Sequence, residues 1–109
     1  MKIMLTFLIT VIASLSITNS ALAADSNAGE KIFMNTCVSC HNKGLNVIAP
    51  ENTLKKEALE KNGMYSEKAI IQQVTNGKSP MPAFGKQLSA SDIENVAAFV
   101  MKQANADWK

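Results

Sequence analysis

Arginine is absent from this 109-residue sequence, histidine occurs once and cysteine twice. Without arginine there can be no twin-arginine export signal. A single histidine excludes any site built from two imidazoles, and two cysteines allow at most one disulfide. There is also little excess of either charge, since the sequence has 11 lysines and 9 acidic residues. This balance gives no reason to expect nucleic acid or an anionic membrane surface as a partner.

The first 23 residues predict a leader. Lys2 supplies a positive charge, residues 3–17 are apolar except for Thr and Ser, and Ala21-Leu22-Ala23 is a small-x-small cleavage site. These features are typical of a Sec-type signal peptide, residues 1–23, cleaved after Ala23. The alternative is an uncleaved membrane anchor, but the run is shorter than the ~20 residues that span a bilayer. Residues 24–109 would then form a single mature domain.

The two cysteines and the histidine fall together in Cys37-Val38-Ser39-Cys40-His41. Cys-x-x-Cys-His is the attachment motif of a c-type haem. A local disulfide would close almost no loop, and a thioredoxin-like redox pair requires a βαβ pattern that is missing around the motif. A zinc site would lack a fourth ligand nearby. We therefore expect one covalent haem c on Cys37 and Cys40, with His41 as an axial iron ligand.

Helical periodicity and cap residues predict four helices and no convincing strand, so the expected fold is all-α. The first helix runs from about residue 27, behind Asp25, Ser26 or Asn27 as N-cap, into the Cys-x-x-Cys turn. The second follows Asn52 or Thr53 and ends at Asn62-Gly63. The third and fourth are bounded by Ser66 and Asn76-Gly77, and by Ser89 or Ser91 and about Gln103 or Asn105.

The stretch 42–52 is a loop by its Gly, Pro and Asn content. Leu45, Val47 and Ile48 are too apolar for a solvated connection. We expect these three side chains to fold back over a face or edge of the haem.

The second axial ligand must come from another residue type, since there is no second histidine. The mature chain has four methionines: Met34, Met64, Met81 and Met101. Met34 is one turn before Cys37, and Met101 sits in an apolar helical stripe, where Met is usually a packing residue. Met81 lies between two prolines, which preset the backbone and lower the entropy cost of holding its side chain at a metal. Met81 is the expected ligand, with Met64 or an open position as alternatives.

Ligation by both His41 and Met81 would leave no position open for oxygen or peroxide. A thioether ligand also favours Fe(II) and raises the reduction potential. This combination predicts an electron carrier that is not an enzyme. The alternative from another class is a haem enzyme or gas sensor in which Met81 is labile.

Further stretches carry a resemblance to one family. They are Gly29-Glu30-Lys31-Ile32-Phe33, Asn46-Val47-Ile48 with Pro50, Thr53-Leu54-Lys55-Lys56, Gly63-Met64, Gln73-Val74-Thr75-Asn76-Gly77-Lys78, Met81-Pro82-Ala83-Phe84-Gly85 and Trp108. With the haem motif, they make the mature chain resemble cytochrome c6, also called cytochrome c-553. This is the soluble photosynthetic cytochrome c of algae and cyanobacteria, a class I cytochrome c.

The resemblance implies a small class I cytochrome c fold, with about four helices around one haem. It implies an electron shuttle in the thylakoid lumen, from cytochrome f of the b6f complex to photosystem I, through brief docking of a monomer without a membrane span. It also implies that Gly29 and Phe33 cross the last helix near Phe99, and that Gln73 tunes the haem potential. A related alternative is a periplasmic class I cytochrome c that serves a respiratory oxidase.

One departure from the family pattern concerns docking. Lys86-Gln87 stands where the family usually has Gly-Arg after Phe-Gly. The positive charge is therefore displaced by one position and is not a guanidinium, which changes how binding to photosystem I would be steered.

Overall fold

The computed structural model describes residues 23–109, so residues 1–22 of the expected leader lie outside the described part. The helical elements are α1 (Ser26–Ile32), η1 (Phe33–Cys37), α2 (Val38–His41), η2 (Asn42–Gly44), α3 (Lys56–Lys61), α4 (Glu67–Asn76) and α5 (Ala90–Asn105). Within residues 23–109 there is no strand, only an isolated bridge between Lys78 and Met81. The expected all-α fold is confirmed. No helix of this part is long and apolar enough to cross a membrane.

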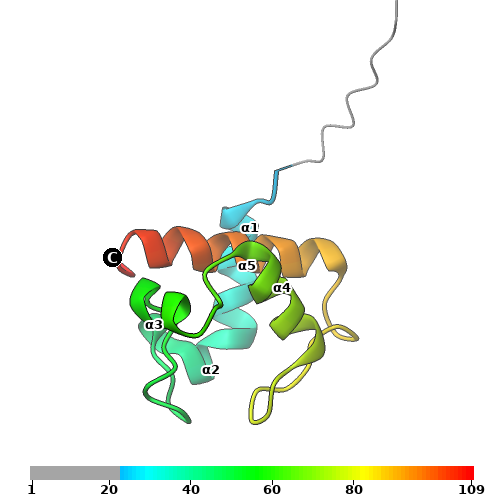
Figure 1. The fold of residues 1–109 in the computed structure, drawn as a ribbon. Coiled ribbons are helices and arrows are strands. Elements are labelled where there is room, and N and C mark those ends of the chain that lie inside the picture. Colours follow the sequence, from blue (N-terminus) through cyan, green and yellow to red (C-terminus); the bar gives the residue numbers. More distant parts are fainter. Residues whose placement is uncertain (1–22) are drawn as a thin grey trace, which may run out of the picture.

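The first expected helix is continuous through α1, η1 and α2 and ends at the haem motif (Figure 1). Asp25 is its N-cap, because its carboxylate accepts from the backbone N–H groups of Asn27 at 2.9 Å and Ala28 at 3.2 Å. Its middle turn, η1, is a π-helix, a wider form that is frequent at functional sites. The sequence pattern did not predict this widening.

For two of the three later helices, α4 and α5, the N-cap residue is one that the sequence predicted. Ser66 caps α4 by accepting from Ala69 N at 3.1 Å, and Ser89 forms a reciprocal capping box with Asp92 on α5. The prediction for the second helix was wrong at its start. Its N-cap is Lys55, which makes no side-chain cap, while the hydroxyl of Thr53 accepts from the Lys55 N–H in a local turn.

The core lies where α1 crosses α5, and α4 packs against α5 as well (Figure 1). At the crossing, a Cβ on Gly29 would overlap the carbonyl oxygen of Asn95 and lie 3.0 Å from Phe99 Cβ. Phe33 packs on Phe99 with ring centroids 5.2 Å apart. The crossing expected from the family resemblance is confirmed. The buried residues are Phe33, Leu59, Ile70, Val74, Ile93, Val96, Ala97, Phe99, Val100 and Ala104.

Candidate haem site

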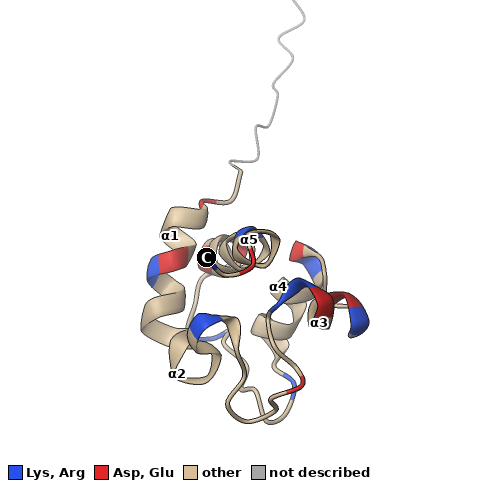
Figure 2. Cartoon of the chain, turned by 90° about the vertical axis from the view of Figure 1, so that its left-hand side faces the viewer, with Lys and Arg blue, Asp and Glu red and all other residues tan. Residues whose placement is uncertain are grey.

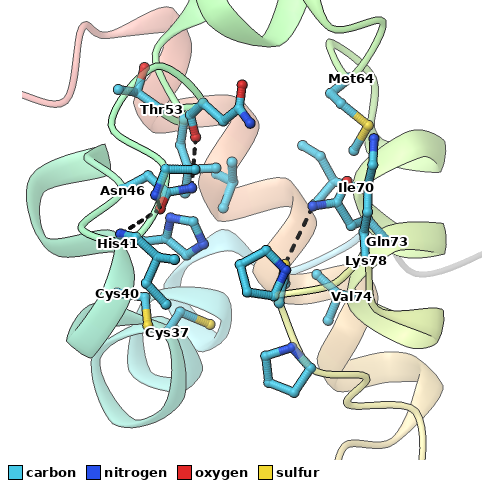
Figure 3. Close-up of a pocket in the computed structure, with 18 of the residues that line it drawn as sticks. Cys37, Cys40, His41, Asn46, Thr53, Met64, Ile70, Gln73, Val74 and Lys78 are labelled. Atoms are coloured by element: carbon cyan, nitrogen blue, oxygen red, sulfur yellow. Dashed lines mark hydrogen bonds between the residues drawn. The ribbon is translucent and has the colours of Figure 1, made fainter.

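A cavity of about 400 Å³ opens between the haem motif, the loop after it and the loop after α4. Cys37, Cys40 and His41 all line it, and Figure 3 shows them together on one wall. Cys37 ends η1, whereas Cys40 and His41 belong to the single turn of α2. The helix therefore presents both sulfur atoms and the imidazole to one space.

The orientation of the His41 ring is fixed by a hydrogen bond. Its Nδ1 lies 3.0 Å from the carbonyl oxygen of Leu45. A carbonyl only accepts, so Nδ1 carries the proton and donates. The Nε2 atom then keeps its lone pair, which is the form in which neutral imidazole binds a metal.

Burial raises the pKa of the Cys37 thiol to about 11, because a thiolate loses its hydration there. A redox-active Cys-x-x-Cys pair requires the opposite shift, toward a reactive thiolate. Burial carries no such cost for a thioether, whose sulfur is neutral. The surroundings of Cys37 thus suit a thioether and disfavour a thioredoxin-like pair.

The opposite wall of the cavity comes from α4 and the segments around it. Figure 3 shows Met64, Ile70, Gln73, Val74 and Lys78 across from His41. Ile70 and Val74 are buried core residues, so this wall is largely apolar. It offers a flat hydrophobic ligand a surface backed by the core.

Met81 reaches the cavity from a loop that is tied to α4. Lys78 N donates to Met81 O at 3.0 Å, and Met81 N donates to Lys78 O at 2.8 Å. Beyond Met81, the Phe84 N–H donates to Val74 O at 2.8 Å. These hydrogen bonds fix the loop at the end of α4, both at Met81 and three residues after it.

Within the part of the chain that the structure describes, the Met81 sulfur has one polar contact. Gln73 Nε2 donates to Met81 Sδ at 3.4 Å, the contact drawn as a dashed line from Gln73 in Figure 3. This places the thioether next to the residue that the family resemblance connected with the haem. Of the other methionines, Met64 also lines the cavity, whereas Met34 and Met101 do not.

The loop after the motif differs in part from expectation. Ile48 lines the cavity, but Leu45 and Val47 do not, and all three are exposed. The loop is held instead by Asn46, whose amide donates to Asn52 O at 3.0 Å and whose Oδ1 accepts from Ala49 N at 2.8 Å. Sequence reasoning counted Asn46 as a loop former and as part of the family resemblance, and assigned no hydrogen bonds to its side chain. The available signal was the asparagine itself, because a loop Asn often accepts hydrogen bonds from the backbone N–H groups two and three residues later.

These residues fit a c-type haem on chemical grounds. Two partly buried thiols stand beside an imidazole with a free Nε2, and a thioether lines the same cavity. One nitrogen and one sulfur donor form the His/Met pair that iron accepts in c-type cytochromes. The remaining lining is rich in apolar side chains, as a porphyrin face requires.

Comparison with known proteins gives a family match over most of the chain. The family model described as cytochrome c oxidase, cbb3-type, subunit III matches residues 24–100. Cytochrome c6 of Rippkaea orientalis is 53% identical over 105 residues, which cover 96% of this chain and 95% of the relative. Cytochrome c6 of Bumilleriopsis filiformis is 58% identical over 85 residues, covering 78% of this chain and 99% of the relative.

A solved structure of a cytochrome c6 has a similar fold. The cytochrome c6 of the diatom Phaeodactylum tricornutum is 55% identical and superposes with a TM-score of 0.75, over 77% of this chain and 99% of that one. Its match and those of the curated relatives establish a class I cytochrome c fold with one covalently bound haem c. Such proteins transfer electrons and are not enzymes. On these grounds the chain belongs to the cytochrome c6 family, the electron carriers of photosynthesis.

Proposed function

We propose that Cys37 and Cys40 carry the haem thioethers and that His41 Nε2 and Met81 Sδ are its axial ligands. When bound, the haem iron supplies single-electron chemistry by cycling between Fe(III) and Fe(II). The observation that carries the proposal is the shared cavity. His41 and the Gln73-held Met81 line it from segments 40 residues apart in the sequence, 41 against 81.

The test of this ligand set is carbon monoxide binding to the reduced holoprotein at neutral pH. We expect the wild type to resist it and to show a near-infrared Met–Fe(III) charge-transfer band when oxidised. Met81→Ala should lose the band and bind carbon monoxide rapidly. Met101→Ala, outside the cavity, is the matched control and should behave as wild type. Loss of the band in Met64→Ala instead would assign the ligand to Met64, and rapid binding by the wild type would favour the enzyme or sensor alternative.

The proposed role is that of a soluble monomer that takes electrons from cytochrome f of the b6f complex and delivers them to photosystem I. The two loops that frame the cavity support transient docking on this side of the protein. Leu45, Val47 and Ile48 are 45%, 63% and 58% exposed. No charged residue occurs in residues 44–50 or 79–85. The ribbon is accordingly tan over most of both loops in Figure 2. A small, largely uncharged contact suits a partner that must leave quickly.

We propose the thylakoid lumen as its location and residues 1–23 as a signal peptide that is cleaved after Ala23, leaving one domain, residues 24–109. The support is the leader pattern in the sequence and the membership in a photosynthetic family. The test is N-terminal sequencing and intact mass of the protein from its native cell. A start at Ala24 with one haem is expected, and an intact leader would contradict the proposal.

A second candidate, electron delivery to a respiratory oxidase, is favoured by the description of the matching family model. Flash-induced oxidation of the reduced holoprotein by photosystem I particles, compared with its oxidation by oxidase-containing membranes, separates the two. Fast photosystem I kinetics with slow oxidase turnover support the photosynthetic role. The reverse ranking would support the respiratory one.

A further inference from the structure

Trp108, the penultimate residue, makes more contacts with the site than its place in the sequence suggests. After α5 the chain turns back, and Trp108 N donates to Gln103 O at 2.8 Å. Asp107 and Trp108 both have positive φ, 55° and 57°, a conformation that non-glycine residues adopt only when other contacts compensate. The turn directs the indole onto the body of the protein.

The indole contacts three parts of the fold. Its ring centroid lies 5.4 Å from that of Phe33 and 6.0 Å from that of Phe99. Its Nε1 donates to Leu54 O at 3.0 Å. Its ring also occupies the space that a Cβ would take on Gly44, a buried glycine with φ 76°. Only a glycine allows this approach.

Gly44 and Leu54 are themselves joined, because Leu54 N donates to Gly44 O at 2.7 Å. Trp108, Leu54 and Gly44 therefore form a closed set of contacts. The residue after Gly44 is Leu45, whose carbonyl oxygen lies 3.0 Å from His41 Nδ1. The acceptor that orients the imidazole is thus one peptide unit away from the contact with the indole.

We propose that Trp108 is a positioning residue for the axial histidine. Its ring packs on Gly44 and its N–H binds Leu54 O, and together these contacts fix the peptide that carries the Leu45 carbonyl. That carbonyl in turn fixes the plane and the hydrogen bond of the His41 ring. The role deepens the proposed function and rests on His41 being an iron ligand. Trp108 acts through the polypeptide and touches neither iron ligand.

The test is hydrogen exchange, followed by NMR, in the reduced, ¹⁵N-labelled holoprotein. Exchange of the His41 Nδ1 proton and the Leu54 amide reports on this wall of the cavity. The Phe84 amide, bonded to Val74 O at 2.8 Å, reports on the other. We expect Trp108→Ala to speed the first two by roughly tenfold and leave the third unchanged. Trp108→Phe keeps a ring on Gly44 but removes the N–H donor, so its His41 and Leu54 exchange rates should lie between those of the wild type and Trp108→Ala.

Tyr65→Phe is the matched control. It removes the hydrogen bond from the Tyr65 hydroxyl to Asn105 at the same end of α5 and should leave His41 exchange unchanged. Unchanged His41 exchange in Trp108→Ala, or equal acceleration at Phe84, would overturn the positioning role. If Trp108→Ala does not fold, Trp108→Phe decides in the same way. Upfield shifts of the His41 ring protons in the wild type show separately that it binds the iron, and their absence would overturn the ligation and this inference together.

Discussion

At the scale of single residues, the two proposed ligand atoms are under opposite electronic influences. His41 donates its Nδ1 proton to Leu45 O at 3.0 Å, which makes its other nitrogen a better electron donor. Met81 Sδ instead accepts a hydrogen bond from Gln73 at 3.4 Å, which draws electron density away from the thioether. With His41 and Met81 as ligands, the first contact would favour Fe(III) and the second Fe(II), so each would contribute to setting the reduction potential.

Removal of the second contact gives the first prediction. Gln73→Val should lower the reduction potential by roughly 20–60 mV, the equivalent of one hydrogen bond of about 0.5–1.5 kcal/mol for a one-electron couple. An optical redox titration of the holoprotein measures it. Gln72→Val, an exposed position one residue away on α4, should leave the potential unchanged. Equal shifts in the two variants would argue against a role for the Gln73–Met81 bond.

At the scale of elements, the link between α4 and the Met81 loop depends on Gly77. Its backbone, φ 72° and ψ 168°, lies in a region that is essentially restricted to glycine. A Cβ there would come within 2.7 Å of Ala83 N and 3.0 Å of Met81 O. Any side chain at this position must push against the loop that presents the thioether.

We therefore expect Gly77→Ala to displace Met81. The Met–Fe(III) charge-transfer band should weaken or vanish, and the free energy of unfolding should fall by about 1–3 kcal/mol. Near-infrared absorption and guanidinium titration measure the two effects. Gly63→Ala serves as control, because Gly63 has a similar φ of 68° but nothing within 4 Å of a new Cβ. A full band in Gly77→Ala would show that the loop tolerates the side chain.

The crossing of α1 and α5 gives a second prediction at this scale. Gly29→Ala gains about 1 kcal/mol of helix propensity but forces a methyl group against Asn95 O, an overpacking that costs about 1–3 kcal/mol or more. We expect a net loss of roughly 1–2 kcal/mol in the free energy of unfolding, measured by guanidinium titration. Glu30→Ala, exposed on the same helix, should change it by less than about 0.5 kcal/mol. Equal effects would mean that the helices can separate without cost.

The sequence predicted those elements whose signals are local. Ser66 and Ser89 cap their helices because the hydroxyl meets a backbone N–H three residues away. The start of α3 was missed because the Thr53 hydroxyl accepts from the Lys55 N–H in a local turn and does not cap the helix. Cys37, Cys40, His41 and Met81, which the motif and the two prolines singled out, all line the cavity, whereas most of its other lining residues were not predicted. The contact of Trp108 with Gly44 joins residues 64 positions apart, 44 against 108, and no local pattern encodes such a pairing.

At the scale of the whole molecule, the two loops that frame the cavity carry few charges, although Lys78 itself lines the cavity. These loops are free of charge over residues 44–50 and 79–85, and the residues just beyond are charged: Lys43, Lys78 and Lys86, and also Glu51. Elsewhere the ribbon in Figure 2 is mainly tan, with short acidic and basic stretches scattered over the helices. This arrangement would let lysines steer an approaching partner while the contact itself stays apolar.

Lys86 provides the test of steering. Lys86→Glu should slow electron transfer to photosystem I about two- to tenfold at low ionic strength, and added salt should shrink the difference because it screens exposed charges. Laser-flash kinetics with photosystem I particles measure the rate. Lys61→Glu reverses another exposed charge, at the end of α3, and should have little effect. An unchanged rate for Lys86→Glu at low salt would exclude this lysine from the docking surface.

The pairing of α1 with α5 also bears on how the protein is made. Gly29 lies near the start of the described chain and Asn95 near its end, so their contact cannot form until the last helix is available. If the leader directs the chain across a membrane N-terminus first, the central packing is completed only after almost every residue has passed. Under that proposal, the topology would keep folding after export, because the chain could not complete its core while it was still crossing the membrane.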